Sequence, residues 1–191
     1  MKESSDKNLR HKLYLIIDDI IKLKRLDVDN YYCSNLIAWF HEVVLKNISI
    51  YKSKKSETEM DQELYKKYRQ NVYWIDFGRN IGSEFQDYHF AVVLYESKYT
   101  ALVVPLTSKK EHTPKWIDES KNVIVDIGII EGFPKDEKEC YACTHMIQSV
   151  SKKRLSRYSD DQGNKHNIKI SDEQMKKISD KVCQIAYNIV S

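Results

Sequence analysis

The sequence lacks any apolar run that approaches the roughly 20 residues of a bilayer-spanning helix. Its first residues, MKESSDKNLR, lack the apolar segment of a secretory signal peptide. Internal repeats and low-complexity tracts are absent too, and 41% hydrophobic with 31% charged residues excludes an intrinsically disordered chain. We therefore expect a globular protein of the cytoplasm, with no membrane partner, whose 191 residues form one main domain with a helical appendage.

The chain also lacks a second Cys-x-x-Cys pair. Of its four cysteines, only Cys140 and Cys143 have this spacing, so a zinc site of four thiolates is not expected. No strand-to-helix junction follows the pair, as a redox motif would require, and we expect reduced thiols at the surface. The sequence predicts neither a metal nor a cofactor.

A strong charge imbalance is likewise missing, since the net charge is only +3. The basic residues are nevertheless bunched, in the runs KSKK (52–55), KKYR (66–69), KK (109–110) and SKKRLSR (151–157). Local positive fields matter more than the total when the partner is a polyanion. Taken alone, each run is more typical of a solvated surface than of a nucleic-acid contact.

The first third of the chain has helical periodicity. LYLIIDDIIKLKRL (13–26) spaces its apolar residues at helical intervals, and DNYYCSNLIAWFHEVVL (29–45) offers Asp29, Asn30 or Ser34 as a cap before a second apolar stretch. Together they predict a helical hairpin. The polar segment 52–70 follows as a linker or exposed helix, so we assign residues 1–70 to a helical N-terminal extension.

From Asn71 the pattern changes to strands, and residues 71–191 are assigned to a second domain. Apolar and β-branched runs predict strands in VYWIDFG (72–78), HFAVVLYES (89–97), YTALVVPLTS (99–108), NVIVDIGII (122–130) and CTHMIQSVSK (143–152). Because no helix separates them, the sheet should be antiparallel and curled, or a small barrel. The chain ends in a helix that begins with a capping box of Ser171 and Gln174, and its buried stripe comprises Met175, Ile178, Val182, Ile185, Ala186 and Ile189.

Four motifs, in order, carry a resemblance to a known family: VYWIDFG, GSEFQDYHFAVVL, VVPLTS and MIQSVSKKRL. Residues 71–191 resemble the PemK/MazF toxins of type II toxin–antitoxin systems. The resemblance implies an α+β fold, namely a small SH3-like antiparallel β-barrel of PemK/MazF/CcdB type with a C-terminal helix. It also implies a metal-independent endoribonuclease that cleaves single-stranded RNA through a 2′,3′-cyclic phosphate, forms a homodimer and is held in check by a cognate antitoxin protein.

The resemblance assigns roles to individual residues. Thr107 matches the family's catalytic threonine, and Ser108 follows it as a second hydroxyl donor. The family's GSE loop, which lines the RNA groove, is matched by Gly82, Ser83 and Glu84, and the basic end of the last motif is matched by Lys152 and Arg154. Glu84 could also orient a neighbouring histidine or bind a nucleotide.

The main departure from the family is His89. It stands in HFAVVL where the family usually has RPAVVL, so it fills the position of the catalytic arginine. A histidine can exchange a proton near neutral pH, whereas an arginine hardly deprotonates. Either His89 takes part in catalysis in a different protonic role, or the activity has been lost.

The loop after the Thr107 strand supplies further candidates. Lys109, Lys110 and Lys115 could bind phosphates, Trp116 could stack on a base, and His112 lies between them. A flexible basic loop with a buried tryptophan is the alternative interpretation. His145 could point into the same groove, although a core histidine is the more ordinary role for it.

Three other functions stay open at this point. The chain could be a catalytically inactive member that binds RNA or protein, a gyrase-poison-like toxin, which shares the same barrel, or a regulatory protein with no toxic role. The substitution His89→Ala separates these from a ribonuclease, because it should abolish cleavage and leave binding largely intact.

Overall fold

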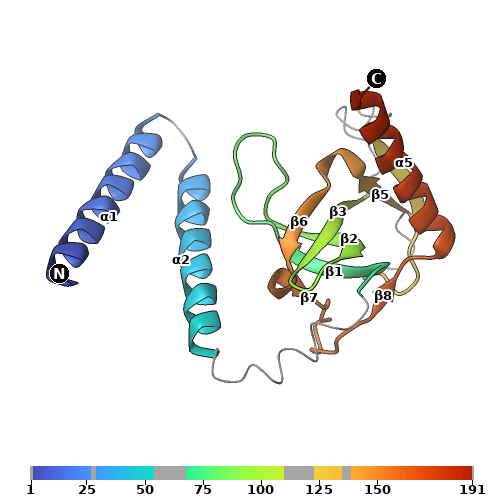
Figure 1. Ribbon diagram of the computed structural model, residues 1–191, viewed down its shortest axis with the longest axis horizontal. Helices are drawn as coiled ribbons and strands as arrows, with labels where there is room; N and C mark the ends of the chain where they lie inside the picture. The colour runs from blue at the N-terminus through green and yellow to red at the C-terminus, as the bar shows by residue number, and fades with distance from the viewer. Residues whose placement is uncertain (1, 27–28, 54–67, 110–122, 135–138, 191) are drawn as a thin grey trace. The chain divides into compact units, whose positions relative to one another are not determined.

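The computed structural model describes residues 2–26, 29–53, 68–109, 123–134 and 139–190 (Figure 1). The chain divides into two compact units, Met1–Lys55 and Ser56–Ser191. The sequence-based boundary, at residues 70 and 71, differs from this division by 15 positions along the chain, since the first unit ends at residue 55. Each unit is described separately below.

The first unit consists of helices α1 (Lys2–Arg25) and α2 (Asn30–Ser53). Asp29 acts as the cap of α2, because its Oδ1 accepts a hydrogen bond of 2.9 Å from the backbone N–H of Tyr31. Along α1, Lys22 and Asp19 form an exposed ion pair. Among the described helices of the chain, none combines the length and the apolar character that a membrane span requires.

The second unit is a curled antiparallel sheet with one long helix (Figure 1). Its strands lie in the order β4-β5-β3-β2-β1-β7, with β6 paired to β3 and β8 to β1. Their bounds are β1 (Asn71–Asp76), β2 (Tyr88–Glu96), β3 (Thr100–Ser108), β4 (Ile124–Ile129), β5 (Glu139–Cys143), β6 (Gln148–Ser151), β7 (Leu155–Ser156) and β8 (Ile168–Lys169). Helix α5 (Asp172–Val190) follows. The predicted α+β class, with its antiparallel sheet, C-terminal helix and N-terminal helical region, is confirmed.

One predicted strand is wrong. Residues 143–152 do not form a single strand: β5 ends at Cys143, the 3-10 helix η1 (Thr144–Met146) turns the chain, and β6 begins at Gln148. Where η1 begins, the backbone N–H and the hydroxyl of Thr144 both donate to the carbonyl of Val123, next to the last β4–β5 pair, Ile124↔Cys143. The chain therefore leaves the line of β5 directly after the β4–β5 pairing ends.

The prediction that Cys140 and Cys143 lie at the surface is wrong. Cys140 and Cys143 are each only 1% exposed, because β5 lies between β3 and β4. Burial raises the pKa of each thiol to about 11. They are therefore buried, unreactive thiols rather than surface ones, and no group of potential metal ligands occurs in the part of the chain that the structure describes.

Two apolar clusters hold the sheet. The first joins β1–β3 to α5 through buried side chains such as Val92, Leu106 and Ile178, and the second lies among Ile75, Val93 and their neighbours. Burial of one such aliphatic side chain contributes about 1.5–3 kcal/mol to stability.

Helix α5 is fixed to the sheet at its first turn. The predicted capping box is confirmed, because the N–H of Ser171 donates to Gln174 Oε1 at 2.9 Å and the N–H of Gln174 donates to Ser171 Oγ at 3.1 Å. Gln174 Nε2 also donates to the carbonyls of Ile127 and Ile129 on β4. Of the predicted stripe, Met175 and Ile178 are buried and Val182 and Ile185 half-buried, whereas Ala186 is exposed and the side chain of Ile189 lies outside the described residues.

Candidate active site

The candidate site lies where β2 and β3 separate. Their pairing includes Val92↔Val104 and reaches Ala91↔Pro105, after which β3 pairs with β5 from Leu106 onward. Proline has no N–H to continue a ladder, so the change of partner falls where pairing is already weakened. His89 on β2 and Thr107 on β3 each lie two residues beyond this last pair, and both line the cavity that opens there.

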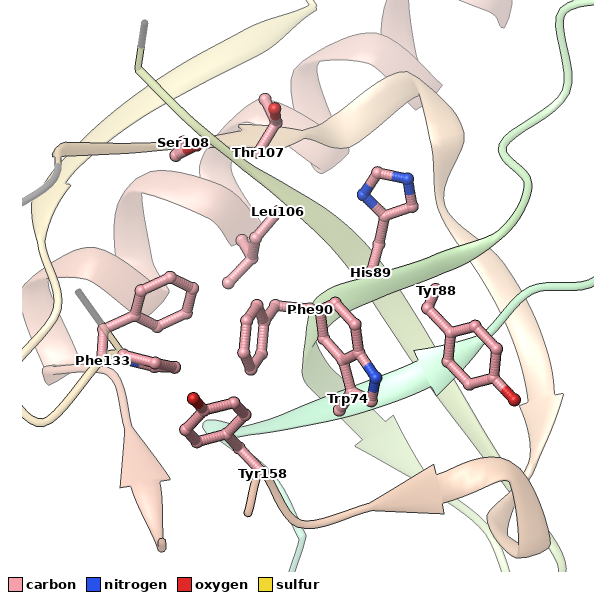
Figure 2. Close-up of a pocket in the computed structure, with 10 residues that line it drawn as sticks. Trp74, Tyr88, His89, Phe90, Leu106, Thr107, Ser108, Phe133 and Tyr158 are labelled. Carbon is pink, nitrogen blue, oxygen red and sulfur yellow. The ribbon is translucent and has the colours of Figure 1, made fainter. Parts of the chain in front are cut away.

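A cavity of about 440 Å³ opens at this separation (Figure 2). It includes His89, Thr107 and Ser108 together with a wall of aromatic rings; the lining residues are Trp74, Tyr88, His89, Phe90, Leu106, Thr107, Ser108, Phe133, Pro134 and Tyr158. In Figure 2, His89 and Thr107 project to one side of the two strands, and Phe90 and Leu106 project to the other. This follows from the alternation of side chains along a strand.

His89 is held by its strand and by an aromatic neighbour. Its backbone pairs with Ile75 on β1, and its half-buried ring packs edge-on against Phe85 with 4.5 Å between ring centroids. Burial lowers the pKa of His89 from its ordinary value of 6.5, and the nearby carboxylate of Asp87 partly opposes this effect. A neutral imidazole at pH 7 can accept a proton, as a general base must.

Thr107 and Ser108 both line the cavity from the end of β3, where strand alternation directs neighbouring side chains to opposite faces. Both are half-buried, and their backbones pair with Tyr141 and Cys140 on β5. The pairing fixes these hydroxyls on a rigid strand rather than on a loop. The structure therefore brings together His89, Thr107 and Ser108, three of the four residues that were predicted to be catalytic.

Glu84, the fourth, takes part in a local turn. Its carboxylate accepts a hydrogen bond from the N–H of Ile81 at 3.3 Å, and its own N–H donates to the Ile81 carbonyl at 3.2 Å. Gly82 and Ser83 lie exposed in the same turn, where Gly82 has a positive φ of 60° that favours glycine. The acid that acts on His89 is instead Asp87, which lies only two residues away and was not predicted.

The basic residues predicted to bind RNA mostly have protein partners. Lys109 forms an ion pair with Glu139 and lies 3.9 Å from Asp126, so its charge is largely compensated. Arg154 is half-buried and donates to the carbonyls of Asp76 and Phe77 at 3.4 Å each. Both residues therefore have partners within the protein itself. Lys110, His112, Lys115 and Trp116 lie outside the described residues.

Lys152, also predicted to bind RNA, has its partners within the protein. Its side chain is only 5% exposed, its Nζ lies 3.1 Å from Glu96 Oε2, and it sits 4.9 Å from the ring centroid of Tyr68. If the Lys152 ammonium moved to bind a phosphate, the Glu96 carboxylate would lose its cation. The Lys152 side chain therefore contributes to the folded structure. His145, expected in the core, is exposed.

The aromatic wall of the cavity was not predicted. Phe90 is its centre, with ring-centroid distances of 4.5 Å to Trp74, 4.5 Å to Phe133 and 5.6 Å to Tyr158. Trp74 stacks in addition on Tyr88 at 6.1 Å. The available signal was the alternation in the first two strand motifs, which puts Trp74 and Phe90 directly opposite each other.

Comparison with known proteins agrees with this geometry. A family model described as "PemK-like, MazF-like toxin of type II toxin-antitoxin system" matches residues 68–186. The chain belongs to this family. The match contains every residue of the cavity and leaves α1 and α2 of this PemK/MazF-family chain outside it.

Other comparisons add little to this assignment. A search of curated proteins returns no match. Among solved structures, MazF (Form-I) from Deinococcus radiodurans is similar over 64% of this chain and 97% of that chain, with 12% sequence identity and a TM-score of 0.43.

Proposed function

We propose that this PemK/MazF-family chain is the toxin of a type II toxin–antitoxin system and acts as a metal-independent endoribonuclease on single-stranded RNA. The observation that carries the proposal is the juxtaposition of His89 with Thr107 and Ser108 at one opening in the sheet. In phosphodiester transesterification a proton acceptor can serve as general base and hydroxyl donors can stabilise charge on the phosphate, so this cavity holds groups suited to both tasks.

In the proposed reaction, His89 removes the proton of a ribose 2′-hydroxyl. The 2′ oxygen attacks the adjacent phosphorus, the bond to the 5′ oxygen breaks, and the products are a 2′,3′-cyclic phosphate and a 5′-hydroxyl whose proton comes from solvent. Thr107 and Ser108 donate hydrogen bonds to the phosphate oxygens as charge develops on them. General-base help from a positioned histidine contributes roughly 10²- to 10⁴-fold in rate.

The family assignment supports the remaining parts of the proposal. We infer that the protein acts in the cytoplasm as a homodimer and that a cognate antitoxin protein covers the site when the toxin is inactive. Exposed Glu84, Gly82 and Ser83 lie in the turn before β2, from which they can contact the RNA.

A specific observation favours a second candidate function. His89 occupies the place where the family resemblance expects an arginine, and an imidazole that is neutral at pH 7 lacks the permanent positive charge of a guanidinium. A member of the family without catalysis, which binds RNA or protein through the same surface, is consistent with that replacement.

Incubation of the purified protein with a long single-stranded RNA in EDTA distinguishes the ribonuclease from the binding protein. The wild type should yield fragments with cyclic phosphate ends, His89→Ala should reduce the rate by about 10²-fold or more, and His145→Ala, which alters an exposed histidine outside the cavity, should cleave normally. Intact RNA from folded, antitoxin-free wild type would instead support the binding protein.

A further inference from the structure

The aromatic half of the cavity has no task in the cleavage chemistry. Trp74, Phe90, Phe133 and Tyr158 come from four separate segments of the chain: β1, β2, the turn after β4 and the hairpin after β7. All four are partly exposed, so their rings contact one another and still present surface to the cavity. An apolar recess lined by aromatic rings fits a part of the ligand that is apolar and flat enough to stack on those rings.

The position of Tyr158 is fixed by its own hairpin. The N–H of His166 donates to the carbonyl of Tyr158 at 2.9 Å, and a β-bridge joins Ser159 to Lys165. His166 Nε2 lies 2.9 Å from Asp160 Oδ2, and the rings of Tyr158 and His166 are 6.0 Å apart. The ring of Tyr158 is therefore already in place before a ligand arrives, which lowers the entropy cost of binding.

The Phe133 side of the recess is similarly held. The N–H of Phe133 donates to the carbonyl of Ile130 at 3.2 Å, which closes a turn directly after β4. Its ring packs against Phe90 at 4.5 Å. Among the described residues that line the cavity there is no carboxylate, so none of its side chains repels an RNA phosphate.

We propose that this aromatic recess stacks one unpaired nucleobase of the RNA, adjacent to the phosphate that His89 and Thr107 address. The inference rests on the proposed function and deepens it. A volume of about 440 Å³ lies in the range of small-ligand sites, which is about 300–1,000 Å³. A base inside a duplex is already stacked and cannot enter, so the recess selects single strands.

Stacking also determines what kind of selectivity the recess provides. Every base has a π-face, so a wall of rings tolerates different bases, whereas hydrogen bonds to base edges discriminate between them. Few polar side-chain groups reach this cavity besides those of His89, Thr107 and Ser108; the rings contribute the indole N–H of Trp74 and the hydroxyls of Tyr88 and Tyr158. The recess therefore selects the unpaired state of the RNA more than the identity of one base.

Binding of a mixed-sequence 2′-fluoro RNA 12-mer, which has no 2′-hydroxyl and cannot be cleaved, tests the recess by fluorescence anisotropy. Tyr158→Leu keeps apolar bulk against Phe90 but removes the flat ring, and it should raise Kd by about 5- to 100-fold. Tyr158→Phe should bind as the wild type does. Tyr95→Leu is the matched control, because Tyr95 is an exposed tyrosine on β2 outside the cavity, and it should leave Kd unchanged.

A second variant and a second readout guard against a folding defect. Phe133→Leu alters the wall from a different segment, and it should weaken binding to a similar extent. With 4-thiouridine in the probe, irradiation should join the RNA to peptides that contain Trp74, Phe90, Phe133 or Tyr158. The wild-type protein should bind a duplex of the same sequence more weakly than it binds the single strand.

The outcomes separate this inference from the proposed function. Single-strand binding that depends on Tyr158 and Phe133, in a protein that leaves RNA intact, supports the recess and overturns the cleavage. Normal cleavage with unchanged Kd and KM in folded Tyr158→Leu and Phe133→Leu overturns the recess and supports the cleavage. If folded wild type neither binds nor cleaves RNA, both proposals are overturned.

Discussion

Asp87 forms an ion pair with Arg79, at 2.9 Å between Oδ1 and Nη2, and the same carboxylate raises the pKa of His89 against the effect of burial. Asp87 has a positive φ of 66°, and its N–H donates to the carbonyl of Gly78. The loop between β1 and β2 thus ends on an acid that is fixed in backbone and side chain, immediately before the strand that carries His89.

Replacement of Asp87 by asparagine should lower the pKa of His89 further. Asparagine has the same shape and tolerates a positive φ, so the loop should keep its conformation while the charge is removed. The midpoint of the His89 titration, followed by NMR of the imidazole protons, should move to lower pH, and so should the acid limb of the cleavage rate. Glu84→Gln removes another acid of the same loop and is the control; an equal shift in both variants would contradict the assignment of Asp87.

The stability of the protein should depend on the protonation of His89. In the unfolded chain the histidine binds a proton below its ordinary pKa of 6.5, whereas burial lowers its pKa in the folded state. The unfolded state therefore binds more protons as pH falls through 6.5, and the free energy of unfolding should decrease there. Urea denaturation at pH 7.5 and 5.5 should show a smaller decrease in His89→Gln than in the wild type. An identical decrease in both would mean that His89 is not the responsible group.

Lys152 and Lys153 are adjacent and should behave in opposite ways. Lys152→Met leaves the carboxylate of Glu96 without its buried cation. Loss of one partner of a buried ion pair costs about 3–5 kcal/mol, and because Glu96 keeps some exposure, the free energy of unfolding should fall by an amount near or below the lower end of that range. Lys153→Met alters an exposed lysine and should leave stability nearly unchanged. Urea denaturation measures both variants. A normal stability with weakened RNA binding in Lys152→Met would restore the role that the sequence suggested.

The hairpin that carries Tyr158 should depend on Asp160. Its carboxylate contacts the imidazole of His166 and accepts hydrogen bonds from the backbones of Asn164 and Gln162, and these interactions, the one with His166 above all, lower the pKa of Asp160 to about 2. Because the folded pKa is depressed, the stabilisation is present above the ordinary value of 3.8 and is lost as pH falls towards 2. Asp160→Ala should speed amide hydrogen exchange at Asn164 and His166 at neutral pH. Asp161→Ala, next to it, should not; equal exchange in both would show that the hairpin does not need this carboxylate.

Local sequence patterns were sufficient for most of the elements. The capping box of Ser171 and Gln174 uses residues three apart, and the alternation around His89 and Thr107 placed both on strands, so local chemistry determined these assignments. The family motifs added which strand ends should meet. The pairing of β2 with β3 then places these residues around one cavity.

Contacts between distant segments could not be predicted in the same way. Tyr158 contacts Phe90 across a separation of 68 positions, and Lys152, in the 3-10 helix η2 (Lys152–Arg154), pairs with Glu96 on β2. The spacing of Cys140 and Cys143 gives no sign that β5 lies between two other strands. In each case the environment of a side chain depends on which strand becomes its neighbour, and hydrophobic periodicity does not contain this information.

The origin of the cavity wall has a consequence for how such a protein can change over evolutionary time. The groups that would react, His89 and Thr107, are carried by strands whose backbones are tied to their neighbours, while Phe133 and Tyr158 are supplied by two turns at the surface. Turns accept substitutions and insertions far more readily than paired strands do. New ligand preferences can therefore arise by altering two short segments of the gene, while the reactive framework is inherited intact.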